Sequence, residues 1–105
     1  MTTSLQVTEN EAAAVAVAPR CTLESIEKKI MHKIFLNGND AIRTVVPAEI
    51  SELSSLTICL IVMENGFVFI GKSAPVEAAN FNAELGKKFA YEDAMRQIWP
   101  YEMLS

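Results

Sequence analysis

The chain has 105 residues, of which half are apolar and 21% are charged, and its formal net charge is −4. This length fits one domain with a small hydrophobic core. The acidic balance argues against a general DNA- or RNA-binding protein, which normally has a basic surplus. It does not exclude a small phosphorylated ligand, because such a ligand needs only a local cluster of donors.

The sequence shows no pattern for a membrane span, an export signal or a metal-binding pair of cysteines. Cys21 and Cys59 have no CxxC spacing, and Cys59 lies in an apolar run, where a buried thiol is the simplest interpretation. That run, residues 56–63, is too short to cross a bilayer. The apolar residues 12–18 follow acidic rather than basic residues, unlike an export signal. We therefore expect an intracellular, reduced protein with no membrane partner.

The pattern divides the chain into a tail and one domain. Residues 1–20 lack a strong apolar period, so we expect a flexible N-terminal tail, within which residues 12–17 could dock on a partner. The pattern changes after Pro19. We expect residues 21–105 to form a single α+β domain.

The domain opens with a predicted helix. Thr22 is a candidate N-cap, and Glu24 lies in the first turn, where the helix dipole favours a carboxylate. Apolar residues then recur at helical spacing as far as about Phe35. Gly38 suits a left-handed cap at the end of this helix. The following segment, residues 41–55, fits either a short helix or a strand.

A β-hairpin is predicted around Asn65-Gly66. Residues 56–63 are rich in β-branched and large apolar side chains, and Asn-Gly favours a two-residue type I′ turn. Such a turn pairs Met63 with Val68. Because apolar residues occur on both faces of the hairpin, one face needs the helices and the other a second subunit. We therefore expect a homo-oligomer.

A second, longer helix is predicted after the hairpin. Asn80 or Asn82 can cap it, and Glu84 lies in its first turn. Apolar residues then repeat at roughly helical spacing until Pro100 ends the helix. These residues are Phe81, Leu85, Phe89, Ala94 and Ile98. Gly86 inside the helix indicates close packing or close approach of a ligand. The expected fold is thus α+β, with an N-terminal helix, an antiparallel β-hairpin and a long C-terminal helix.

The sequence offers no catalytic or metal-binding set. Only one histidine, His32, is present, and no pair of cysteines or histidines suits zinc. The carboxylates are scattered, so no general acid and base can be paired. No Walker loop or dinucleotide fingerprint occurs. We expect a protein that is not an enzyme and that uses no metal and no cofactor.

Binding chemistry is better represented, after the hairpin and along the second helix. Lys72 and Ser73 follow the hairpin, and Asn80 lies where the helix begins, where free backbone N–H groups suit a phosphate. Lys88 and Arg96 share one helix face with Glu92. The aromatic side chains that could stack on a base are Phe67, Phe69 and Tyr91. The alternative is that Lys88, Glu92 and Arg96 form an ordinary solvated face of ion pairs.

Three stretches together resemble a family of small tailed-phage and prophage accessory proteins: LTICLIVMENGFVFIGKSA, NFNAELGKKFAYEDA and IWPYE. The family shares an Asn-Gly-Phe turn after a β-branched strand, a Gly-x-Ser arm, an Asn-Phe-x-x-Glu-x-Gly helix opening and an Ile-Trp-Pro ending. The upstream APRCTLESIEKKI is similar to the family's entry into its first helix. The resemblance covers residues 18–102. It departs after Pro100, where the family commonly has Leu-x-Gly-Tyr.

This family is similar in size, layout and phage origin to the sponge proteins that counter Thoeris and related nucleotide-signalling defences. The similarity implies a homo-oligomer in the host cytoplasm that sequesters a cyclic ADP-ribose isomer or a cyclic dinucleotide without cleaving it. The expected ligand-binding residues are Phe67, Lys72, Ser73, Asn80, Lys88 and Arg96. The phenyl ring would stack on a base, the three cations would neutralise phosphate, and the serine and asparagine would orient the ribose or phosphate. The alternative is an accessory protein that binds a host or phage protein.

Overall fold

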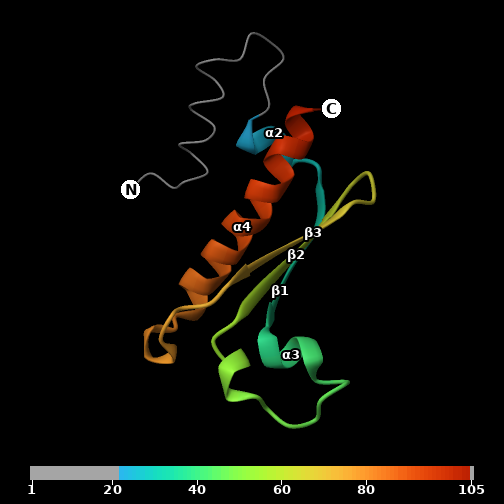
Figure 1. Cartoon of the computed structure of the whole chain (residues 1–105). Helices are drawn as coiled ribbons and strands as arrows, with labels where there is room; N and C mark the ends of the chain where they lie inside the picture. The colour runs from blue at the N-terminus through green and yellow to red at the C-terminus, as the bar shows by residue number, and fades with distance from the viewer. Residues whose placement is uncertain (1–21, 105) are drawn as a thin grey trace.

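The computed structural model of the protein describes residues 22–104 (Figure 1). The expected tail, residues 1–20, therefore lies outside the described residues. The elements, in chain order and labelled as in Figure 1, are α2 (Leu23–Glu27), β1 (Ile30–Asn37), α3 (Gly38–Ile42), the 3-10 turn η1 (Ser51–Leu53), β2 (Thr57–Met63), β3 (Val68–Ser73), the 3-10 turn η2 (Ala78–Asn80) and α4 (Ala83–Met103). The predicted α+β class with a long C-terminal helix is confirmed.

The molecule has two layers, a sheet and a long helix. The three strands are antiparallel in the order β1-β2-β3, and α4 lies across one face of this sheet, packed on β2 and β3 (Figure 1). In the same view α2 lies near the C-terminal end of α4, and α3 lies at the far end of the sheet. The buried core between the two layers consists of Ile26, Cys59, Ile61, Met63, Ala90, Ala94, Met95, Ile98 and Trp99. The predicted burial of Cys59 is thus confirmed.

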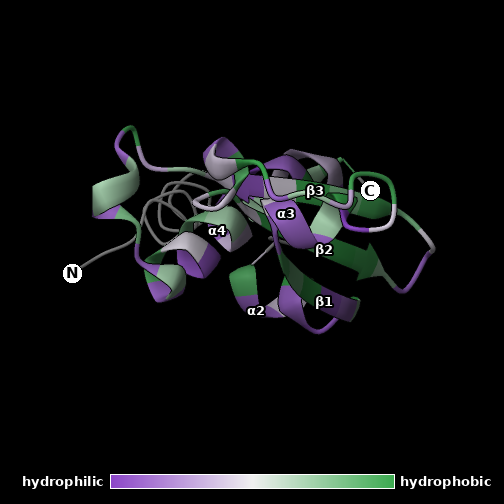
Figure 2. Ribbon diagram, turned by 90° about the horizontal axis from the view of Figure 1, so that it is seen from below, coloured by the Kyte–Doolittle hydropathy of each residue, from purple (hydrophilic) through white to green (hydrophobic). Residues whose placement is uncertain are grey.

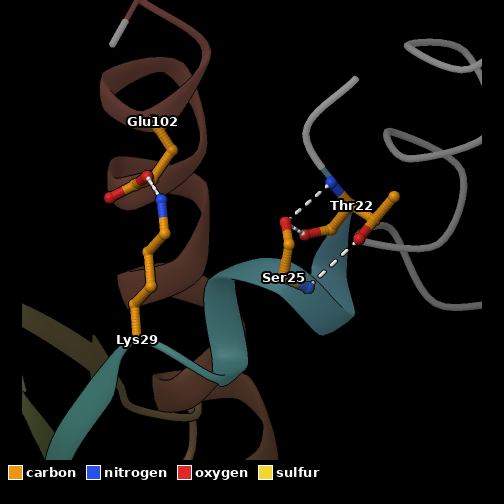
Figure 3. A network of polar contacts seen from close by, with 4 residues as sticks. All are labelled: Thr22, Ser25, Lys29 and Glu102. Carbon is orange, nitrogen blue, oxygen red and sulfur yellow. Dashed lines mark hydrogen bonds and ion pairs between the residues drawn. The ribbon is translucent and has the colours of Figure 1, made fainter. Parts of the chain in front are cut away.

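The first helix begins as predicted but is much shorter than predicted. The Thr22 hydroxyl accepts a hydrogen bond from the Ser25 N–H, and the Ser25 hydroxyl oxygen accepts one from the Thr22 N–H (Figure 3). This reciprocal capping box confirms Thr22 as the N-cap. The helix ends at Glu27, and the predicted extension to Phe35 is wrong, because those residues form β1.

Tertiary pairing explains this error. The residues after Glu27 are rich in β-branched and large apolar side chains, and the backbone of β1 pairs with β2 along almost its whole length. The prediction that Gly38 caps a helix C-terminus is also wrong, since Gly38 opens α3 and Asn37 caps it. A Cβ at Gly38 would lie 2.7 Å from the Leu53 carbonyl oxygen, so close packing against η1 accounts for the glycine.

The hairpin exists, but its turn has three residues rather than two. The Met63 N–H donates to the Phe67 carbonyl oxygen at 2.8 Å, and the Gly66 N–H donates to the Met63 carbonyl oxygen at 2.9 Å. Gly66 has φ +91°. A three-residue loop with a left-handed glycine at its third position is the next commonest hairpin connection after the two-residue turn.

The longer turn shifts the register by one residue. Val68 pairs with Val62, so the predicted pairing of Val68 with Met63 is wrong. Side chains alternate between the two sheet faces, so the shift decides which residues share a face. Ile61 now shares the α4 side of the sheet with Phe69, whereas Ile70 lies on the other side. Figure 2 shows β2, the central strand, as strongly hydrophobic.

α4 approaches the sheet unusually closely at two glycines. A Cβ at Gly71 would lie 2.0 Å from the Ala90 carbonyl oxygen and 2.6 Å from the Ala94 N–H nitrogen. A Cβ at Gly86 would lie 2.4 Å from the Thr57 hydroxyl oxygen. Gly86 therefore serves close helix–strand packing, one of the two roles expected for it.

The last turn of α4 passes through Pro100, so the prediction that this proline ends the helix is wrong. Proline at this point removes only one helical N–H, and side-chain contacts anchor the residues beyond it. The Tyr101 ring lies edge-on to Phe67, with ring centroids 5.0 Å apart. Glu102 accepts a charged hydrogen bond from Lys29 at 2.9 Å (Figure 3).

Candidate functional site

A pocket lies where the segment between β3 and α4 meets the first two turns of α4. It encloses about 280 Å³, just below the usual range for small-molecule pockets, whose lower end is about 300 Å³. We call it the α4 pocket. The lining residues important for the argument are Ser73, Asn80, Phe81, Leu85, Gly86 and Phe89.

An exposed apolar stripe forms the main wall of the α4 pocket. Phe81, Leu85 and Phe89 are 37%, 48% and 45% exposed, although residues four apart on a helix normally mark a buried face. The buried face of α4 instead contains Ala90 and Ala94, one residue further along and so about 100° around the helix axis. The single apolar face predicted for this helix is therefore two stripes, and only one of them packs on the sheet.

The backbone at the start of α4 is already engaged. The Asn82 side-chain oxygen accepts hydrogen bonds from the N–H groups of Glu84 and Leu85, at 3.0 and 3.1 Å. The Gly86 N–H donates to the Asn82 carbonyl oxygen. The predicted cap at Asn82 is confirmed, and these three N–H groups are not available for the phosphate that the sequence suggested.

Two polar side chains of the α4 pocket remain available. Within residues 22–104, neither the Ser73 hydroxyl nor the Asn80 side-chain amide has a hydrogen-bond partner. The two groups belong to segments on either side of the connection between β3 and α4, and both line the pocket. A hydroxyl and an amide provide both donors and acceptors. The pocket therefore combines aromatic walls with directional polar groups.

One cation lies beside these aromatic walls. The Lys88 Nζ lies 5.9 Å from the centroid of the Phe89 ring, and the ion pairs of residues 22–104 do not include Lys88. The neighbouring Lys87 instead faces Glu84 at 3.9 Å. Lys88 is thus the lysine whose ammonium group lies over a ring of the pocket wall.

The other three expected ligand-binding residues lie elsewhere. Phe67 is six strand residues from Ser73, roughly 20 Å along the sheet. The side chain of Lys72 lies on the opposite sheet face from Ser73, because neighbouring strand residues alternate, and its N–H donates to Asp93. Arg96 is about 12 Å further along α4 than Lys88. The chain thus brings together Ser73, Asn80 and Lys88, and not all six residues.

The remaining candidates from the sequence have structural partners. Tyr91 donates its hydroxyl hydrogen bond to Glu27 at 3.0 Å, and the Lys33 Nζ lies 4.9 Å from its ring centroid. Burial, and then the adjacent Glu27 carboxylate, raise the pKa of Tyr91 well above its usual value. Glu92 is only 8% exposed. The alternative of a solvated Lys88–Glu92–Arg96 face is therefore wrong at its central residue.

A second hollow, of about 320 Å³, lies on the β1 side of Phe81. Three of its polar side chains already have partners: the Asn37 amide donates to the Ser54 carbonyl oxygen at 2.7 Å, Asp40 pairs with Arg43 and Lys87 pairs with Glu84. We therefore take the α4 pocket as the candidate site.

No group of three or more His, Cys, Asp or Glu side chains in residues 22–104 is placed to hold a metal ion. In the same part of the chain, no helix combines the length and apolar character needed to cross a membrane.

The fold defines a small α+β protein in which a long helix covers one face of a three-stranded antiparallel sheet. The chain belongs to the phage protein (N4 Gp49/phage Sf6 gene 66) family, whose model matches residues 21–103. The family match supports the resemblance to phage accessory proteins that the motifs indicated. Comparison with curated proteins and with solved structures gave no match.

Proposed function

We propose that this phage protein acts by binding rather than by catalysis: it takes up a nucleotide-derived immune signal in the α4 pocket and holds it intact. The observation that supports this most directly is the pairing of two available polar groups, on Ser73 and Asn80, with the exposed rings of Phe81 and Phe89. A nucleoside needs this combination, because its base is flat and its edges are polar.

Each group would have a distinct role in holding the signal. A base would stack on one of the two phenyl rings, an interaction that tolerates any base. Ser73 and Asn80 would hydrogen-bond the base edge or the ribose. Lys88, beside Phe89, would neutralise a phosphate as a charge-assisted donor. The volume of about 280 Å³ suits a base with its ribose, so the phosphates would lie at the mouth, on the Lys88 side.

The same geometry supports retention without cleavage. Ser73 is the only hydroxyl nucleophile among the lining residues, and within residues 22–104 no base is hydrogen-bonded to it. An alcohol without an adjacent base is a weak nucleophile. We therefore expect any bound signal to be released unchanged.

The first experiment is to incubate the protein with a panel of cyclic dinucleotides and cyclic ADP-ribose isomers, remove free ligand, and then heat the complex. A sequestering protein returns intact ligand in the released fraction. An enzyme returns product. Recovery of the whole panel in the unbound fraction would overturn the proposal.

Variants test whether the α4 pocket is where binding occurs. Lys88→Ala should weaken binding of the retained nucleotide by about 2 kcal/mol, or roughly thirtyfold, because a hydrogen bond to a charged group is lost. Lys87→Ala is the matched control, since it removes a neighbouring lysine that pairs with Glu84. Arg96→Ala should also bind normally, because of its distance along the helix. Equal affinities for Lys88→Ala and Lys87→Ala, measured by calorimetry, would remove Lys88 from the site.

A second candidate function is binding of a host or phage protein, which the stripe of Phe81, Leu85 and Phe89 favours. Exposed apolar residues in one stripe are typical of protein contacts. This function predicts that the nucleotide panel stays unbound, while Phe89→Ala abolishes capture of a phage or host protein that the wild type retains.

A further inference from the structure

α4 covers only one face of the sheet (Figure 1), and the other face is apolar. The cross-strand pairs place three rows of side chains on that face, His32–Val62–Val68, Ile34–Leu60–Ile70 and Leu36–Ile58–Lys72. We call these nine positions the open sheet face. All except the lysine and the histidine are aliphatic. Ile34, Val68 and Ile70 are 46%, 57% and 57% exposed, so no element within residues 22–104 shields the outer strands on this side.

Two outward backbone groups at the β3 edge of the sheet are bonded to side chains of α4. The Lys72 N–H donates to the Asp93 carboxylate at 3.0 Å, and the Gln97 side-chain amide donates to the Ile70 carbonyl oxygen at 2.7 Å. Both backbone groups point away from β2, because their residues form non-hydrogen-bonded pairs in that ladder. Satisfied edge groups do not template another strand.

The β1 edge is also unsuited to strand addition. A register shift lies between Ile30 and His32, and such irregularities bend a strand away from a flat partner. Lys33, an exposed cation on the same strand, is one of the devices that proteins use to block edge pairing. The open sheet face is therefore the surface of the sheet that is left for a partner.

The charges of the open sheet face favour a second copy of the same chain. The protein has a formal net charge of −4, yet none of its carboxylates is among these nine positions. Two copies can therefore meet there without opposing acids. Its polar members, His32 and Lys72, lie at diagonally opposite corners of the three rows.

We propose that the open sheet face is the contact between two copies of this chain, stacked face to face about a two-fold axis. An axis parallel to β2 sets β1 of one copy against β3 of the other, so that His32 lies opposite Val68 and Lys72 opposite Leu36. An axis across the strands sets His32 opposite Leu36 and Lys72 opposite Val68. In neither arrangement does Lys72 lie opposite another Lys72 or opposite His32. Leu60 lies at the centre in both.

The packing distances agree with this arrangement, and the size of the patch predicts a weak contact. Three strands about 4.8 Å apart and five residues long give a patch roughly 14 Å by 17 Å. Aliphatic side chains from two such faces fill the gap of about 10 Å between stacked sheets. In projection this patch covers about 240 Å² on each copy, which is below the range of stable specific interfaces, so we expect a weak dimer that forms only at high micromolar concentration.

The test is light scattering of the full chain after size-exclusion chromatography. The wild type should be dimeric at high micromolar concentration. Ile70→Glu should be monomeric with a melting temperature near that of monomeric wild type, because the side chain is already 57% exposed and the charge blocks stacking. Val45→Glu is the matched control: this residue is 80% exposed, lies outside the open sheet face, and should leave the dimer intact.

Two outcomes would overturn the proposal. One is a wild type that remains monomeric at high micromolar concentration. The other is an Ile70→Glu protein that still forms dimers, because the contact must then lie elsewhere. If Ile70→Glu does not fold, Val68→Glu on the same face, with the same exposure, decides instead. The result does not depend on nucleotide binding, so the proposed function can fail while this inference stands.

Discussion

The absent side chain at Gly71 sets the distance between α4 and the sheet. With Ala90 and Ala94 opposite, it lets the helix backbone approach the strand backbone directly. In the sequence this glycine stands out only as the first residue of the Gly-x-Ser motif. Its structural role is to admit α4, and the neighbouring Ser73 and Lys72 then point to opposite sides of the sheet.

Gly71→Ala is therefore expected to be severe. The new Cβ would lie 2.0 Å from the Ala90 carbonyl oxygen, so the helix must move. We expect a loss of about 3 kcal/mol in the free energy of unfolding, at the upper end for overpacking. Urea unfolding followed by circular dichroism measures it.

Gly66→Ala is the control glycine substitution. No atom lies within 4 Å of a Cβ there, and only the positive φ is strained, at a cost of about 1 kcal/mol. If Gly71→Ala proves no more harmful than Gly66→Ala, the close helix–strand approach is not what requires Gly71.

At the scale of elements, α2 and α4 are joined by a small polar contact at the edge of the core. Tyr91 on α4 donates to Glu27 at the end of α2, and Ile26 of α2 is 1% exposed within the core. The Lys29–Glu102 ion pair makes a further link between the residues after α2 and the last turn of α4 (Figure 3). These contacts hold a five-residue helix that is far too short to persist alone.

The Tyr91 contact predicts a loss of stability at alkaline pH. Its pKa is raised in the folded protein, whereas an unfolded tyrosine ionises near pH 10. Above about pH 10 the unfolded state therefore releases this proton first, and the free energy of unfolding falls as pH rises. Tyr91→Phe should show a shallower fall in melting temperature between pH 9 and 11.

Lysine side chains in general also lose their charge near this range. The test therefore compares the slope of melting temperature against pH for Tyr91→Phe with the slope for the wild type. Tyr101→Phe is the matched control, because this tyrosine is 45% exposed and its ring packs by its edge on Phe67. A Tyr91→Phe protein with the wild-type slope would contradict the assignment.

At the scale of the whole molecule, the elements of residues 22–104 cover the sheet on one side only. If the open sheet face joins two chains, folding and association are linked, because only the folded chain can dimerise. The melting temperature of the wild type should then rise with protein concentration through the micromolar range. The melting temperature of Ile70→Glu should not change with protein concentration. A wild-type melting temperature independent of concentration, measured by calorimetry, would contradict the linkage.

Local signals in the sequence determined the parts of the fold that depend on neighbouring residues. The Thr22 and Asn82 caps, the turn near Gly66, the apolar strand that contains Cys59 and the long C-terminal helix all rest on interactions within a few positions, and all were predictable. The family could also be recognised from the sequence, because each of its motifs is a contiguous stretch. The predicted end of the first helix was wrong, because a distant segment decides it. Residues 30–37 form β1 since β2 is available to pair with them.

The candidate site was only partly predictable for the same reason. Ser73, Asn80 and Lys88 are close in sequence to the start of α4, and the fold brings them to one pocket. Phe67 and Lys72 were expected beside them. Phe67 instead lies at the other end of β3, and the Lys72 side chain lies on the opposite face of the sheet. Phe81 and Phe89 were grouped with Ala94 and Ile98 as one apolar face, because spacing alone cannot tell which of two stripes on a helix meets the sheet. Only tertiary packing decides that. Here the small residues face the sheet, because they allow the closest approach of the two backbones, and the phenyl rings lie on the exposed side.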